Sequence, residues 1–519
     1  MEVKMKNEKD WIRLQEVGGK PLTDAIKKLY SLFGEEMLDW FAELYDPGTG
    51  GFYASIPGRD GVSFGPDIQC TVQALNFMVN SGLTRDVGTD WREFLPEDMQ
   101  HRMIYFAKSL QSPENGYFYH KQWGRAGTDS KLSRRGRDLN WATMLFEGLG
   151  SAPTYDAPNG LKGDGITADE YWDSLGTDLP RPYTYDRSPV ELIEADSELA
   201  SMSETDELEA AANLRRAIET APAAAGGNGD TTAYLKSHTG YIRYLLDRAE
   251  PGMHKNPYQM GNETGSVKNE LEASSEKLGP YKFKEEDGEE CRQFDGMTLT
   301  EMLIAVLKRT INPETGIWGD LTPEAPLGSE FRYINGFFKT VGRFLEHGTY
   351  YPPEYIPMAA EKIMACLLGD EPSTSNVCEI FNIWSTVFFL KENVSAIPDE
   401  KVRKSTLEYV DTILKEKAPE AVLNTYKKLK GYKKCDGGLA HNYKRGTTIH
   451  QGLPVSPNRN VSDMDGTCCG CTGAIRNMFR ALGLFEYKPP IFDSEDWRRF
   501  CKKLSEKKPI VKKKYVLAK

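Results

Sequence analysis

The stretch LYDPGTGGFYASIPGRDGVSFGPDIQCTVQAL (Leu44–Leu75) leaves a helix-like segment, turns, crosses a polar loop and enters a second helix. Asp-Pro-Gly-Thr-Gly-Gly is turn-forming, because Pro fixes φ and Gly tolerates positive φ. Asp67 stands before Ile68, after which apolar residues recur at helical spacing, so Asp67 is a predicted N-cap. The stretch therefore predicts two helices joined by a long polar loop.

The same order of features recurs loosely in three later segments, Leu110–Gly150, Ile311–Gly348 and Lys433–Leu484. In each, a helix-like segment ends in a turn, a Gly is followed by an aromatic residue or Leu, and a polar loop leads into a new helix. Recurrence of one such unit predicts stacked helical hairpins. We expect an all-α chain, an α/α toroid of about six helical hairpins. Long loops and small β-hairpins are expected where the inner helices begin.

The remaining chain is expected to belong to the same single domain, residues 1–519. An acidic, Pro/Gly-rich excursion interrupts the pattern at about 155–229. The basic tail at 502–519 is expected to be solvated and partly frayed.

Composition limits the partners and the compartment. The formal net charge of −11 argues weakly against a nucleic-acid or anionic-membrane surface. The first residues lack an apolar signal region, and no run of about 18 apolar residues occurs. Nine cysteines, an odd number, fit reduced thiols. We expect a cytoplasmic protein that acts on a small molecule or oligosaccharide and binds neither nucleic acid nor membrane.

The opening stretch resembles the repeat of the terpene cyclase/protein prenyltransferase superfamily of α/α toroids, with its Gly-Gly-Phe turn, its Asp before Thr and its Ala-Leu helix. SDMDGTCCG (Ser462–Gly470) is similar to a degraded form of the Asp-x-Asp-Asp-Thr acid motif of class II terpene cyclases. That resemblance implies Asp465 as the proton donor, although Gly466 follows where the family has a second Asp. The long polar loops are closer in character to α/α-toroid carbohydrate-active enzymes.

Glycoside hydrolysis needs two carboxyl groups on either side of one bond, and elimination from uronic acids commonly uses Tyr and His. The loops that precede the predicted inner helices supply such groups. The candidate catalytic residues are Asp67, Asp138, Asp320, Glu330, Asp465, His120 and Tyr119. For Asp67 and Asp138 we consider an N-cap role more common than catalysis.

Substrate contacts are expected from the same loops, because Trp and Tyr stack on sugar faces and Arg binds carboxylates. The candidate substrate-binding residues are Trp123, Arg125, Arg137, Glu263, Trp318, Arg332, Tyr333 and His441.

The last repeat also contains Cys435, His441 and Cys468, which are zinc-ligand types. Buried thiols that pack as small hydrophobic groups are the favoured interpretation, and we expect no cofactor. A zinc ion in this region is the less favoured alternative.

The leading hypothesis is a carbohydrate-active enzyme that cleaves an oligosaccharide or glycoconjugate, by glycoside hydrolysis in preference to lyase elimination. One alternative is a class II terpene cyclase-like or prenyl-diphosphate-using toroid enzyme. The second alternative is a toroid that binds a ligand without catalysis.

Overall fold

The computed structural model describes residues 7–219, 232–321, 331–369 and 376–517. It is mostly helical, with 62% helix and 6% strand, as the recurring helical spacing predicts. Among the described helices, none is both long and apolar enough to cross a membrane.

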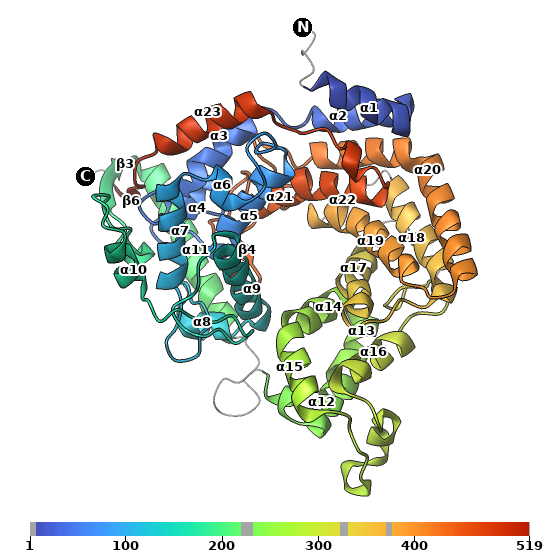
Figure 1. Ribbon diagram of the computed structural model, residues 1–519. Coiled ribbons are helices and arrows are strands. Elements are labelled where there is room, and N and C mark those ends of the chain that lie inside the picture. The colour runs from blue at the N-terminus through green and yellow to red at the C-terminus, as the bar shows by residue number, and fades with distance from the viewer. Residues whose placement is uncertain (1–6, 220–231, 322–330, 370–375, 518–519) are drawn as a thin grey trace.

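One series of helices surrounds the centre of the molecule (Figure 1). Each member packs against the next, and the last returns to the first, so that α5 contacts α9, α9 contacts α14, and α21 contacts α5. The members are α5 (Ile68–Asn80), α9 (Leu132–Gly148), α14 (Pro257–Ser266), α17 (Phe331–Glu346), α19 (Cys378–Ser395), and α21 (Met464–Cys468) continuing through a π turn (Cys469–Gly473) into α22 (Ala474–Ala481). We call these the inner helices.

Other helices pack on the outside of this series, as α7 does on α9, and α18 and α20 do on α19. The outer helices are α2 (Lys20–Tyr30), α3 (Glu35–Leu44), α7 (Glu97–Ser109), α12 (His238–Tyr244), α13 (Glu250–Lys255), α15 (Lys268–Leu278), α16 (Leu299–Arg309), α18 (Ile356–Leu368) and α20 (Glu400–Lys430). The further helices are α1 (Glu8–Gly18), α4 (Ile56–Asp60), α6 (Trp91–Phe94), α8 (Gly124–Asp129), α10 (Ala168–Ser174), α11 (Ser197–Glu219) and α23 (Ser494–Ser505).

Short 3₁₀ turns and a second π turn complete the helical elements. The 3₁₀ turns are Tyr185–Arg187, Ala233–Lys236, Glu285–Asp287, Glu289–Phe294, Pro353–Tyr355 and Phe485–Tyr487, and the π turn is Leu245–Ala249. Two small antiparallel hairpins are present, one of β1 (Tyr45–Asp46) with β2 (Gly51–Phe52) and one of β4 (Ile449–His450) with β5 (Leu453–Pro454).

The four sequence repeats share one local structure, a tight turn that follows an outer helix and leads toward an inner one. Each turn contains a glycine with positive φ, a conformation that side chains with a Cβ disfavour. These glycines are Gly50, Gly116, Gly316 and Gly437. The residue that closes each turn pairs back across it and is fully buried, and these residues are Phe52, Phe118, Trp318 and Leu439. A glycine followed by an aromatic residue or Leu therefore indicates a turn whose last side chain is buried in the core.

The inner helix α5 contains polar side chains although it is buried. Its residues from Ile68 to Leu75 are all buried, although Gln69, Thr71 and Gln73 are polar. A helix enclosed by neighbours on every side must satisfy such groups with other protein groups.

The C-terminal tail differs from the expectation of a frayed segment. Its residues form β6 (Lys512–Leu517), which pairs in parallel with β3 (Val190–Ala195) of the acidic excursion. Lys512 is buried and donates to the carbonyls of Gly58 and Arg59. Residues 512–517 therefore form a paired strand where a frayed segment was expected, because strand pairing joins two segments that are far apart in the sequence.

Candidate functional site

Two thiols, an imidazole and a carboxylate converge at one point among the inner helices. The Sγ of Cys378 lies 3.2 Å from the Nε2 of His441 and 3.8 Å from the Sγ of Cys469. Asp465 approaches both partners, with 3.4 Å from Oδ2 to the His441 Nε2 and 3.8 Å from Oδ1 to the Cys469 Sγ. We call these four residues the thiol cluster.

The cluster is assembled from the starts of two inner helices and one loop. Cys378 is the first residue of α19, Asp465 belongs to the first turn of α21, and Cys469 begins the π turn that follows it. His441 comes from the loop after α20. Reactive groups at helix starts benefit from the positive end of the helix dipole, which favours the thiolate and carboxylate forms.

Asp463 fixes the loop that carries His441. It is the N-cap of α21, accepting from the Gly466 amide at 2.8 Å, and it also accepts from the backbone amides of His441 and Thr447 at 2.6 and 2.9 Å. A Cβ added at Gly466 would lie 2.3 Å from the His441 backbone nitrogen. The glycine that breaks the class II cyclase motif is therefore required by this close approach.

The charges within the cluster shift the pKa values of its members. The contact with the Cys469 sulfur lowers the pKa of Cys378, with further help from His441, against the effects of burial and of Asp465. Burial opposes protonation of His441, but Cys378, Asp463 and Asp465 outweigh it and raise the pKa of the imidazole. Burial would raise the pKa of Asp465, yet His441 and the hydrogen bond from Gln73 hold it below its ordinary value. The thiol and the imidazole thus each shift toward their charged forms.

Three residues of the thiol cluster offer ligand atoms that lie close enough together to hold a metal ion. A carboxylate oxygen of Asp465 and the sulfurs of Cys378 and Cys469 all lie within 4.8 Å of one another. His441 is not part of this set, and its Nε2 lies 3.4 Å from Asp465 Oδ2, whereas the Cys469 sulfur approaches Oδ1. Two thiols and a carboxylate are donors that zinc accepts.

A cavity of about 340 Å³ lies among the inner helices α9, α14, α17 and α19. Its lining includes Arg137, Asn140, Asn262, Lys339 and Arg343. The ammonium of Lys339, which lines this cavity, interacts electrostatically with Arg137 and with Cys378, Cys469 and Asp465 of the thiol cluster.

A second set of buried polar groups lies near the thiol cluster, and α5 and Asp465 connect the two sets. Arg134 pairs with Asp138 at 2.6 Å and lies 3.8 Å from Asp67, which caps α5. The Nδ1 of His450 lies 3.6 Å from Asp67, and the Nε2 of His120 lies 3.8 Å from Asp138. All five side chains are buried.

Burial determines the protonation of this second set. It lowers the pKa of His120 to about 3, with help from Arg134. It raises the pKa of Asp138 to about 6, against the attraction of Arg134. Asp67 behaves in the opposite way, because Arg134 and His450 overcome its burial and hold its pKa well below the ordinary value. Asp67, Cys70 and His450 are spaced for a metal ion as well, but Arg134 already supplies a cation there.

The structure brings His441 and Asp465 together in the thiol cluster, and Arg137 lines the cavity of about 340 Å³. Asp67, Asp138 and His120 lie in the buried second set. Trp123 joins that set through its ring, which the Arg134 guanidinium covers at 4.3 Å, and its indole donates to the Pro454 carbonyl.

Other sequence candidates lie apart from the cluster. Trp318 is enclosed by Phe337, Phe344 and Tyr351, so no face is free for a sugar, and Tyr333 is buried. Asp320 is exposed beside His254. Tyr119 donates to Asp129, Arg125 pairs with Glu114, and Glu263 pairs with Arg248. Glu330 and the side chain of Arg332 lie outside what the structure describes.

Cys378 and Lys339 were not among the residues predicted from the sequence. Of the cysteines named for a less favoured zinc site, Cys435 is exposed, and Cys468 contacts the Met464 sulfur and the Gln73 carbonyl. Its neighbour Cys469 belongs to the thiol cluster, because adjacent residues of a helix point in different directions.

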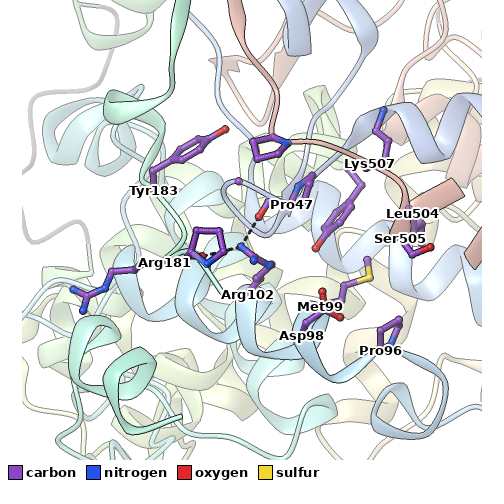
Figure 2. A pocket seen from close by; sticks show the side chains of 14 residues that line it. Pro47, Pro96, Asp98, Met99, Arg102, Arg181, Tyr183, Leu504, Ser505 and Lys507 are labelled. Atoms are coloured by element: carbon purple, nitrogen blue, oxygen red, sulfur yellow. Dashed lines mark hydrogen bonds between the residues drawn. The ribbon is translucent and has the colours of Figure 1, made fainter. Parts of the chain in front are cut away.

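A separate cavity of about 290 Å³ lies between α7, the segment around Tyr183 and the residues after α23 (Figure 2). Arg102 there donates to the carbonyls of Pro47 and Pro180, so its charge is engaged by the backbone. The lining contains no cysteine or histidine among the described residues. This cavity is therefore a weaker candidate for a catalytic site than the thiol cluster.

Comparison of the chain with protein-family models, with curated proteins and with solved structures found no match. The function is therefore argued from the site itself.

Proposed function

We propose that the chain is an α/α-toroid hydrolase that cleaves glycosidic bonds at the thiol cluster. The observation that carries the proposal is the convergence of Cys378, His441, Asp465 and Cys469, of which the first and last two offer ligand atoms within 4.8 Å of one another. Lys339, which lines the cavity of about 340 Å³, interacts electrostatically with this cluster. The closed series of contacts among the inner helices supports the toroid, because hairpins stacked in a ring bring all the inner-helix starts to one mouth.

The cavity suits a sugar better than a prenyl chain. Arg137, Asn140 and Asn262 offer hydrogen bonds to hydroxyl groups, while Phe338 and Phe389 offer apolar faces to the C–H surface of a ring. A terpene pocket would be lined mainly by apolar groups. Asp465 is moreover a poor proton donor to an alkene, since its pKa is held below the ordinary value.

In this proposal Cys378 is the nucleophile. Its sulfur attacks the anomeric carbon, the bond from that carbon to the leaving oxygen breaks, and the oxygen takes up a proton. Water then cleaves the carbon–sulfur bond and restores the thiol. Lys339 and Tyr258, which both interact electrostatically with Cys378, are the groups from which the leaving oxygen would receive its proton.

Cys378, Cys469 and Asp465 would hold the zinc ion. When bound, zinc would favour the deprotonated thiols and, with three protein ligands, would leave a position at which an oxygen of the substrate is polarised. Gln73 would orient Asp465 through its 2.8 Å hydrogen bond.

The test is a screen of the purified chain against neutral and uronic-acid-containing glycosides, reading new reducing ends and the ultraviolet absorbance of an unsaturated product. Hydrolysis, with new reducing ends and no unsaturated product, is expected, and Cys378→Ala should abolish it while Cys435→Ala should not. Full activity of Cys378→Ala would exclude the thiol cluster as the centre, and an unsaturated product would make the chain a lyase.

A further inference from the structure

The cavity of about 340 Å³ among α9, α14, α17 and α19 carries an excess of positive charge. Three cationic residues, Arg137, Lys339 and Arg343, line it, and the one carboxylate in its lining is Glu346. The whole chain has a formal net charge of −11, so a local excess of cations contrasts with the rest of the molecule. Such an excess in a concave site raises the local concentration of anions.

The cations have few internal partners. Arg343 pairs with Glu346 through Nη1 at 2.6 Å, but its buried Nε has no hydrogen-bond partner among the described residues. Neither Arg137 nor Lys339 forms an ion pair with a carboxylate within the described part of the chain. Lys339 instead lies over the rings of Phe338 and Tyr258, at 4.8 and 5.8 Å.

Arg137 stands apart from the two arginines that precede it. Arg134 is bound to Asp138, and Arg135 lies 3.4 Å from Asp129, so both are engaged within the protein. Arg137, one helical turn along α9, faces the cavity. The proximity of Arg137, together with burial, lowers the pKa of Lys339 to about 8. A bound anion would relieve this repulsion between cations.

We infer that the substrate of this site is an anionic sugar, whose oxyanion is held by Arg137 and Arg343. The statement that a glycosidic bond is cleaved rests on the proposed function. The statement that an anion is bound does not depend on it. A guanidinium presents parallel N–H donors that match a carboxylate, phosphate or sulfate group, so the oxyanion is the recognised feature. Lys339, which lines the same cavity, would lie beside the bound group.

The test measures binding in the Cys378→Ser variant, so that the result does not depend on turnover. Binding of three anionic probes, each compared with its neutral parent sugar, is measured by calorimetry at low and high salt. The probes are D-glucuronate, glucose 6-phosphate and N-acetylglucosamine 6-sulfate. At least one anionic probe is expected to bind about tenfold or more tightly than its parent, and added salt should weaken that binding. Which probe binds identifies the carboxylate, phosphate or sulfate.

Arg137→Gln should remove about tenfold or more of that affinity, as should Arg343→Gln, while the exposed Arg498→Gln should leave it unchanged. Two arginine variants are used so that misfolding of one leaves the other informative. Equal binding of charged and neutral probes, no binding of any anionic probe, or undiminished binding in a folded Arg137→Gln variant would overturn the inference. Anion binding by a chain that hydrolyses no glycoside would instead contradict the proposed function alone.

Discussion

The Nε2 of His441 lies 3.2 Å from the Sγ of Cys378, although 62 residues of the chain separate the two. The pairing depends on two packed elements, because Cys378 begins α19 and His441 is fixed by the cap residue of α21.

Asp465 and Asp463 stand two residues apart and should behave differently when changed to Asn. Asp465→Asn should lower turnover by about 100-fold or more, because the negative charge that faces His441 is lost. Its free energy of unfolding should change little, since Asn can still accept the hydrogen bond from Gln73. Asp463→Asn should instead cost about 1–3 kcal/mol of stability, because a carboxylate that accepts three backbone amides is replaced. Steady-state kinetics and urea unfolding of both variants check the contrast, and equal losses of activity at unchanged stability would refute it.

Gly466 should tolerate no side chain. In Gly466→Ala the new methyl group would meet the backbone of Ala440 and His441, so the loop must move away. We expect a loss of about 1–3 kcal/mol in the free energy of unfolding and a loss of activity with it. The control is Gly342→Ala on α17, where a Cβ meets no atom within 4 Å, and a small gain of about 0.5–1 kcal/mol is expected. A Gly466→Ala variant as stable as the wild type would show that the loop is not held in this position.

Asp138 should give the stability a distinctive pH dependence. Burial raises its pKa to about 6 from an ordinary 3.8, so the folded protein binds a proton that the unfolded chain has already released. This contribution to stability is complete below pH 3.8 and is lost as the pH rises through 6. Urea unfolding between pH 4 and 6 should show the free energy of unfolding falling by up to about 1 kcal/mol per pH unit from this group. Asp138→Asn should remove that slope, whereas the exposed Asp320→Asn should keep it. An identical slope in wild type and Asp138→Asn would contradict the raised pKa.

The repeats could be predicted from the sequence because the turns need glycine at positive φ and a buried residue after it. Gly50, Gly116, Gly316 and Gly437 supply the first requirement, and both are visible as short local patterns. The same patterns were misleading about function, because the aromatic residue after the glycine is a core residue, as Trp318 illustrates. A local signal for packing was interpreted as a platform for a sugar.

The thiol cluster could be predicted only in part. Asp465 stood out because SDMDGTCCG resembles an acid motif, and His441 stood out because it shares one repeat with several cysteines. Cys378 did not, since its segment SNVCEIFNIW (Ser375–Trp384) has neither the glycine turn nor a spacing to the other ligands. Its role depends on the contacts between α19 and the π turn after α21, which are made by folding over about 90 residues of intervening chain. The buried Asp67–Arg134–Asp138 set similarly combines an N-cap with a residue in mid-helix, which sequence spacing does not reveal.

The most direct test of the central claim is the zinc content of the chain purified from zinc-supplemented cells, measured by elemental analysis in wild type, Cys378→Ser, Cys469→Ser and the exposed control Cys435→Ser. The account predicts about one zinc per chain in wild type and in Cys435→Ser, and little or none in the two cluster variants, with hydrolysis lost in parallel. Wild type without zinc, or a full equivalent of zinc in Cys378→Ser, would contradict the thiol cluster as a zinc-holding reaction centre.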